Sequence, residues 1–150
     1  MLKKGDNSPD FEGVDQDGNK ISSKDYKGKK FVIYFYPKAS TPGCTAESCD
    51  LRDNENALKA KGYEIIGVSA DSVQRQKNFA TKYNLPFPLI ADEEKEIIKA
   101  FGVWGRKKFM GKEYDGIIRT TFIVDENGLI ENVIEKVKTK EHAKQILELD

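Results

Sequence analysis

Two short apolar runs separated by a helical pattern constrain the fold of this chain more than any other feature. Residues 31–36 and 63–69 are rich in β-branched and aromatic side chains and are short enough to be buried strands. Between them, residues 44–61 follow a helical pattern that Gly62 closes. Strand, helix and strand in this order predict a βαβ unit.

The rest of the chain extends this unit into an α/β fold. A final hairpin and a closing helix predict a mixed central sheet flanked by helices, preceded by an N-terminal β-hairpin. This order matches a thioredoxin-like sandwich. The predicted N-terminal hairpin covers 11–14 and 20–21. In the middle of the chain, the predicted elements are a helix from its cap at Asp71 or Ser72 to Tyr83, a loop over 85–88, a strand over 89–91 and a helix capped by Asp92 and ending near Phe101. An irregular glycine-rich segment over 102–116 then precedes strands over 119–124 and 129–135 and a helix capped by Thr139 and ending near Leu149.

Length and charge limit the classes of protein to which the chain can belong. Its 150 residues suit one domain, residues 1–150, with a substantial core. Twenty-five basic and twenty-five acidic residues cancel, so we expect neither nucleic acid nor a membrane surface as a partner. The sequence has no signal-peptide pattern, and two cysteines are too few for a secreted disulfide scaffold. We therefore expect a soluble cytoplasmic protein with free thiols.

Cys44 lies where the first strand pattern gives way to the helix pattern. The unpaired amides and the dipole at a helix start stabilise an anion, and the thiolate is the reactive form of cysteine. Thr41 is suited to capping this helix, and Pro42 to its first turn. The pattern predicts a reactive cysteine at an exposed helix start, and hence redox chemistry. A buried core cysteine is the alternative.

A second cysteine, Cys49, follows five positions later on the same predicted helix. On an unbroken helix the two Cα atoms would lie about 8–9 Å apart on different faces, beyond the limit of about 7 Å for a disulfide. If the two sulfurs bond, the first turns of the helix must unwind, which favours a transient catalytic disulfide. A structural role inside the helix is the alternative for Cys49.

The spacing of the cysteines also excludes some kinds of site. There is no Cys-x-x-Cys, which argues against a dithiol isomerase or a thioredoxin. A zinc site needs three or four protein ligands, whereas the chain offers two cysteines and one histidine, His142, which we expect at the surface. We therefore expect no metal and no cofactor.

The same residues carry a resemblance to a known family. Pro37, Thr41 and Cys44 have the spacing Pro-x-x-x-Thr-x-x-Cys, the signature of the peroxiredoxins. The longer run Tyr-Pro-Lys-x-x-Thr-Pro-Gly-Cys-Thr-x-Glu-x-Cys resembles the subgroup called bacterioferritin comigratory protein or peroxiredoxin Q. The resemblance runs nearly end to end, through residues 9–11, 17–18, 26–28, 102–105, 111–112 and 116–122.

This resemblance implies a thiol-dependent peroxidase for hydrogen peroxide and organic hydroperoxides, acting in antioxidant defence. By it, Cys44 is the peroxidatic cysteine, Cys49 the resolving cysteine of the same chain, and Arg119 the active-site arginine. The implied cycle passes through a Cys44 sulfenic acid and a Cys44–Cys49 disulfide, which a thioredoxin or a similar dithiol reduces. The resemblance also suggests a monomer.

Peroxide reduction needs hydrogen-bond donors around the thiolate and the departing oxygen. Arg119 can supply a permanent charge and several N–H groups, Thr41 a hydroxyl, and Gly43 a backbone amide at the helix start. Pro37 would shield the thiolate from water. Thr41 could instead be only a cap, and Arg119 only a surface charge.

Glu47 falls three residues after Cys44, on the adjacent helical face. It can orient Arg119 through a carboxylate–guanidinium contact. A solvated surface glutamate is the alternative reading of this position.

Three other functions remain open on the sequence alone. A redox sensor or holdase chaperone could use the same disulfide as a switch, and a thiol oxidoreductase could act on protein disulfides. A structural domain without activity is the third. Repeated and rapid turnover of peroxide would distinguish an enzyme from all three.

Overall fold

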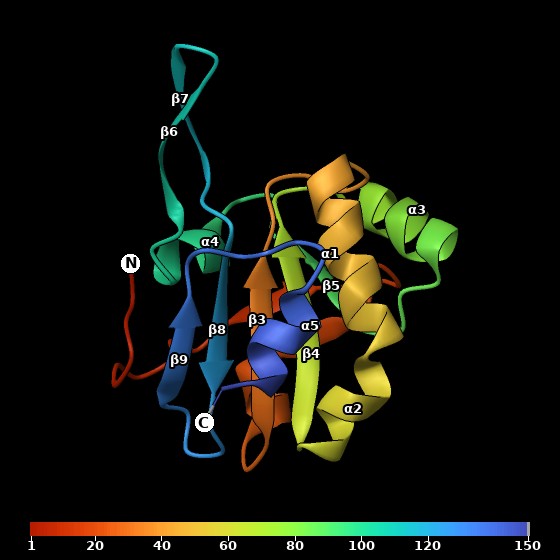
Figure 1. Cartoon of the computed structure of the whole chain (residues 1–150), viewed down its shortest axis with the longest axis vertical. Coiled ribbons are helices and arrows are strands. Elements are labelled where there is room, and N and C mark those ends of the chain that lie inside the picture. Colours follow the sequence, from red (N-terminus) through yellow and green to blue (C-terminus); the bar gives the residue numbers. More distant parts are fainter. Residues whose placement is uncertain (150) are drawn as a thin grey trace.

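The computed structural model describes residues 1–149, and its centre is a five-stranded mixed sheet (Figure 1). The strand order is β5-β4-β3-β8-β9. Strands β3, β4 and β5 are parallel, whereas β8 runs antiparallel to β3 and β9 antiparallel to β8. The mixed sheet predicted from the sequence is therefore confirmed. The strands are β3 (Lys30–Phe35), β4 (Tyr63–Ser69), β5 (Leu89–Ala91), β8 (Thr120–Val124) and β9 (Ile130–Ile134).

The central strand β3 supplies side chains to a core on each side of the sheet. Val32 and Tyr34 belong to one buried cluster, and Phe31, Ile33 and Phe35 belong to the other. This division follows from the alternation of side chains along a strand. Because both faces are buried, the strand reads as a continuous apolar run in the sequence.

Helices cover both faces of the sheet (Figure 1). Apolar residues of α1, α2, α3 and α5 join the cluster of Val32 and Tyr34, whereas those of α4 and of the segment before β1 join the cluster of Phe31 and Ile33. The helices are α1 (Pro42–Asp53), α2 (Glu55–Ala60), α3 (Val73–Tyr83), α4 (Glu96–Ala100) and α5 (His142–Leu147). The predicted N-terminal hairpin is also present, as β1 (Glu12–Val14) and β2 (Lys20–Ser22), followed by the 3₁₀ helix η1 (Ser23–Tyr26).

The single helix predicted over 44–61 is wrong, because the chain forms α1 and α2 with a break at Asn54. The side-chain amide of Asn54 donates to the Asp50 carbonyl at 2.8 Å. Its backbone N–H donates to the Leu51 carbonyl, three residues back, instead of the one four residues back. An asparagine side chain that competes for backbone groups in this way interrupts a helix. Helix α1 also begins earlier than predicted, at Pro42.

The irregular segment predicted over 102–116 is also wrong. Residues 104–117 form a β-hairpin of β6 (Trp104–Phe109) and β7 (Lys112–Ile117), which projects away from the sheet (Figure 1). Met110 and Gly111 both have positive φ, as the favoured two-residue hairpin turn requires. The hairpin lacks a buried face, so it has no apolar alternation by which the sequence could reveal it.

Of the two caps predicted for α3, Ser72 is the one present, and its side chain accepts from the Arg75 amide. Two other helix starts differ from the predictions. Helix α4 begins after Lys95, although Asp92 still accepts from an amide within it. Helix α5 begins after Glu141 rather than Thr139. Within residues 1–149, none of the helices has the length and apolar character that crossing a bilayer requires.

Candidate active site

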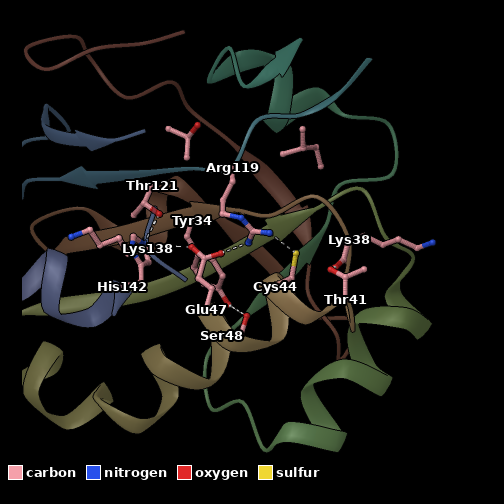
Figure 2. A network of polar contacts seen from close by, with 12 residues as sticks. Tyr34, Lys38, Thr41, Cys44, Glu47, Ser48, Arg119, Thr121, Lys138 and His142 are labelled. Atoms are coloured by element: carbon pink, nitrogen blue, oxygen red, sulfur yellow. Dashed lines mark hydrogen bonds and ion pairs between the residues drawn. The ribbon is translucent and has the colours of Figure 1, made fainter. Parts of the chain in front are cut away.

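The sheet topology brings the start of α1 and the start of β8 to one place. Strand β3 leads through residues 36–41 into α1, and its last residue, Phe35, is paired with Thr120 of the antiparallel β8. Arg119 directly precedes β8, so it lies at the end of the sheet where α1 begins. Figure 2 shows the Arg119 side chain pointing to Cys44 and Glu47, both on α1.

Cys44, the third residue of α1, is in contact with a cation. The Arg119 Nη2 donates to the Cys44 Sγ at 3.3 Å. Burial alone lowers the pKa of Arg119, but its attraction to the Cys44 sulfur and to Glu47 outweighs this effect and raises it. The expectation of an exposed cysteine is wrong, because Cys44 is 0% exposed within the core between α1 and the sheet. A guanidinium at this distance stabilises a thiolate.

Glu47 lies one turn further along α1 and binds the same guanidinium. Its Oε1 accepts from the Arg119 Nη1 at 2.7 Å. The expected contact with Arg119 is therefore confirmed, and the alternative of a solvated surface glutamate is wrong, because Glu47 is fully buried. Burial raises the pKa of Glu47 to about 7, although Arg119 acts in the opposite direction. One cation thus serves both the sulfur and the carboxyl.

His142 belongs to this polar group, and its expected surface position is wrong. The residue is the first of α5 and is fully buried. Its Nε2 is 2.7 Å from the Thr121 hydroxyl and 3.5 Å from the Glu47 Oε2. Figure 2 shows the ring next to Glu47, on the side away from Cys44. A lone histidine on a short amphipathic segment gave no sequence signal of this burial.

The loop between β3 and α1 carries Pro37 and Thr41. Thr41 stands at the N-cap position of α1, but its side chain binds no helix amide. Its hydroxyl instead donates to the Lys38 carbonyl at 2.7 Å, so the interpretation of Thr41 as a side-chain cap is wrong. The donated proton leaves the lone pairs of this oxygen available to a further donor. Pro37 is partly buried at the start of the loop.

A carboxylate that the sequence did not single out for this purpose anchors the same loop. Asp71 is buried, and its Oδ2 accepts from the Ala39 amide at 2.8 Å and from the Ser69 hydroxyl at 2.6 Å. The adjacent Ser40 has a φ of 64°, a left-handed conformation that is costly for a serine. The Asp71 contact thus holds the loop in a shape that it would not adopt unaided.

Gly43 allows Arg119 to approach the helix. A Cβ atom at this position would meet the Arg119 Nη2 at 3.1 Å, which is closer than nine in ten real Cβ contacts. The absent side chain therefore leaves room for the guanidinium beside the start of α1.

Cys49 is partly buried on the same helix as Cys44, and both cysteines are free. Helix α1 is unbroken between them. Ideal helix geometry then separates their Cα atoms by about 8–9 Å, which is too far for a disulfide. A bond between the two sulfurs requires the start of α1 to unwind. Among residues 1–149, no three histidine, cysteine or acidic side chains are grouped so as to hold a metal ion.

Comparison with known proteins identifies the family. A family model described as AhpC/TSA matches residues 4–133. Peroxiredoxin Bcp from Escherichia coli strain K12 is 46% identical over 146 residues, which are 97% of this chain and 94% of the relative. Peroxiredoxin Bcp from Bacillus subtilis strain 168 is 45% identical over 144 residues, 96% of this chain and 92% of the relative.

A solved structure agrees with these relatives. The bacterioferritin comigratory protein of Xanthomonas campestris, solved in trapped intermediate and ligand complexes to examine its alkyl peroxide reduction activity, superimposes with a TM-score of 0.85 at 36% identity. The match covers 91% of this chain and 87% of that protein. The predicted thioredoxin-like fold of the peroxiredoxins is thus confirmed. The chain belongs to the AhpC/TSA family and, like its Bcp and peroxiredoxin Q relatives, is a thiol peroxidase.

Proposed function

We propose that this protein reduces hydroperoxides with the Cys44 thiolate as the attacking group. The sulfur attacks the terminal oxygen, an S–O bond forms and the O–O bond breaks. Cys44 becomes a sulfenic acid, and the departing oxygen takes up a proton to leave as water or an alcohol. The observation that carries this proposal is the 3.3 Å contact between the Arg119 Nη2 and the Cys44 Sγ at the start of α1.

The neighbouring groups are suited to the charge that moves in this step. Negative charge leaves the sulfur and builds on the departing oxygen, so donors are needed at both atoms. Arg119 is held beside the sulfur, and its side chain is 22% exposed, so a substrate that arrives from solvent can reach it. The Thr41 oxygen can accept from the peroxide O–H, and the amides of Gly43 and Cys44 belong to the first turn of α1.

Access of the substrate to Cys44 requires a local movement. A residue with no exposed surface cannot be touched by a probe of the size of water, and a peroxide oxygen is of similar size. The Arg119 side chain lies over the adjacent Gly43. A small displacement of this side chain would open the sulfur while keeping the cation close to both reacting oxygens.

Cys49 is the resolving cysteine in this proposal. After the start of α1 unwinds, its thiol attacks the Cys44 sulfenic sulfur, a disulfide forms and water leaves. A thioredoxin-type dithiol then reduces the disulfide and restores both thiols. We further propose that the protein acts as a monomer in the cytoplasm, where such dithiols keep cysteines reduced.

The proposed substrates are alkyl hydroperoxides and hydrogen peroxide. The similarity to the Xanthomonas protein examined for alkyl peroxide reduction supports the first class. Both classes contain the O–O bond that is broken. The mechanism requires only a terminal oxygen that the thiolate can reach, so it applies to both.

Thiol counting and mass spectrometry after one equivalent of peroxide test the cycle. The wild type should lose both thiols and two hydrogens as an intramolecular disulfide forms. Cys49→Ser should consume one peroxide per chain and then stop with thioredoxin as reductant, and Cys44→Ser should not react. Sustained turnover by Cys49→Ser would remove Cys49 from the mechanism, and a fast reaction of Cys44→Ser would remove the proposed nucleophile.

A further inference from the structure

The buried Glu47 carboxyl has one oxygen that does not take part in its hydrogen bond with Arg119. Its Oε2 is inaccessible to solvent and has no hydrogen-bond partner. Such an atom is costly, because burial removes its water without replacing it. The His142 Nε2 lies 3.5 Å away, on a helix that the sequence places far from Glu47. This pairing calls for a functional explanation.

We propose that His142 is a positioning residue of the peroxidase site. It keeps the Glu47 carboxyl in place, and Glu47 in turn aims the Arg119 guanidinium at the Cys44 sulfur. This inference rests on the proposed function, in which Cys44 is the nucleophile. It adds a residue of α5 that does not touch the substrate.

The hydrogen bonds of His142 define which ring nitrogen carries the proton. The Gln145 amide is oriented by two backbone groups, since its Nε2 donates to the Lys136 carbonyl at 3.0 Å and its Oε1 accepts from the Lys138 amide at 2.9 Å. The His142 Nδ1 lies 2.8 Å from that Oε1, so Nδ1 is the donor. The neutral ring then accepts from the Thr121 hydroxyl at Nε2.

These two bonds fix the ring between a helix and a strand. Gln145 holds Nδ1 from α5 itself, and Thr121 holds Nε2 from β8. The ring therefore cannot turn without breaking one of them, and its Nε2 edge stays against Glu47. On the other side of the carboxyl, Arg119 binds Oε1 at 2.7 Å. Glu47 is thus enclosed between a fixed ring and a guanidinium.

The charged and titratable groups around Glu47 and His142 come from three parts of the fold. Arg119 reaches Glu47 from the segment before β8, and Cys44 shares that guanidinium. The Tyr34 hydroxyl faces the same space from β3 and is bound to Ser48. Asp50 of α1 accepts from the Ala143 amide at the start of α5. Arg119 is the permanently charged group of the set.

A ring that accepts from Thr121 offers no proton to Glu47. The carboxylate form therefore gains nothing at Oε2, and burial raises the pKa of Glu47 to about 7 while burial lowers that of His142 to about 4. Near neutral pH, Glu47 spends much of its time protonated. The charge of Arg119 is then available to the Cys44 sulfur and is not neutralised by Glu47.

Two substitutions separate the contact with Glu47 from the packing of α5. His142→Asn keeps a polar group near the Nδ1 position and removes the edge that faces Glu47. His142→Gln keeps an amide near the Nε2 position, where it can hold Glu47 again. Ile146→Ala is the matched control, because Ile146 is a fully buried core residue of the same helix and its apolar side chain makes no hydrogen bond.

The assay is the second-order rate constant of the reduced protein with an alkyl hydroperoxide, measured by rapid quenching, alkylation of thiols and mass spectrometry over pH 5–9. We expect His142→Asn to be about tenfold slower, because a small displacement of Glu47 would move the Arg119 guanidinium away from the Cys44 sulfur. His142→Gln should recover most of the rate, with the Glu47 inflection near pH 7 moved to lower pH by the donated N–H. Ile146→Ala should lose stability but keep the wild-type rate and profile.

Each outcome of this assay has a defined meaning. Unchanged rates and pH profiles in both His142 variants overturn the positioning role. The same loss in Ile146→Ala also overturns it, since loosening α5 would then suffice. Cys44→Ser separates the two proposals. If it reacts like the wild type, the proposed nucleophile is wrong, whereas an inert Cys44→Ser with unchanged His142 variants refutes only the positioning role.

Discussion

Replacing Glu47 and His142 one at a time should give stability curves with opposite pH dependence. Both side chains are fully buried, and burial moves their pKa values in opposite directions. The pKa of Glu47 rises from 4.5 to about 7, so its stabilising contribution is present below pH 4.5 and is lost as the pH rises through 7. The pKa of His142 falls from 6.5 to about 4, so its contribution is present above pH 6.5 and is lost as the pH falls through 4.

The magnitude follows from the size of these changes in pKa. Each is about 2.5, which corresponds to about 3 kcal/mol of the free energy of unfolding, or about 1.4 kcal/mol for each pH unit within the titration window. Between pH 4.5 and 6.5 the folded pair holds one proton, on Glu47. The unfolded pair also holds one, on His142. The contributions of Glu47 and His142 to the pH dependence of the free energy of unfolding therefore cancel in the wild type. Replacing one residue leaves the contribution of the other visible.

Urea unfolding of the reduced proteins from pH 4 to 7.5 measures this effect. Relative to the wild type, Glu47→Gln should gain about 3 kcal/mol as the pH rises from 4.5 to 7, whereas His142→Asn should lose about 3 kcal/mol as the pH rises from 4 to 6.5. Taking the difference from the wild type removes the contribution of all other titrating groups. Ile146→Ala should give a constant offset. Parallel curves for the two polar variants would refute the reasoning.

Three further substitutions test the geometry around the sulfur. Gly43→Ala should slow the peroxide step about tenfold with little change in stability, because the new Cβ would displace Arg119 from its 3.1 Å approach; a wild-type rate would show that this approach is not required. Asp71→Asn should lower the free energy of unfolding by about 1–3 kcal/mol and slow the same step, since the Ala39 amide loses its carboxylate partner; stability loss without a rate change would separate the loop from the chemistry. Arg119→Lys should slow the peroxide step about a hundredfold, because one ammonium cannot replace the two N–H contacts. Peroxidase rates measured at saturating thioredoxin check this.

The sequence predicted the parts of the fold that depend on local patterns. Strand β4 matches its predicted range, because its apolar residues are bounded by Gly62 and by the polar residues after Ala70. The hairpin of β8 and β9 follows from the turn over residues 125–128. The position of Cys44 in the first turn of α1 follows from the run of threonine, proline and glycine before it. In each case the residues that specify the structure are adjacent in the chain.

The sequence could not predict the burial of Glu47 and His142. Charged side chains are almost never fully buried unless they are paired, so a surface position was the expectation for His142 and the alternative to the Arg119 contact for Glu47. Their pairing depends on the docking of α5 against α1 and β8, which joins residues that are far apart in the chain. The break at Asn54 and the β6–β7 hairpin were missed for another reason, because neither shows a periodic pattern of apolar residues in the sequence.

The charges at the site explain why Cys44 and Glu47 cannot both be ionised at little cost. A thiolate and a carboxylate beside one guanidinium leave a net negative charge in a buried place, which is unfavourable. The two anions compete for the same guanidinium. The reactive state combines the Cys44 thiolate with a protonated Glu47. Once the sulfur becomes a neutral sulfenic acid, this competition ends, Glu47 can ionise, and Arg119 pairs with it fully. The first turn of α1 then loses the contact between Arg119 and Cys44, while the contact with Glu47 holds the next turn, so the unwinding that Cys49 requires is favoured at the first turn.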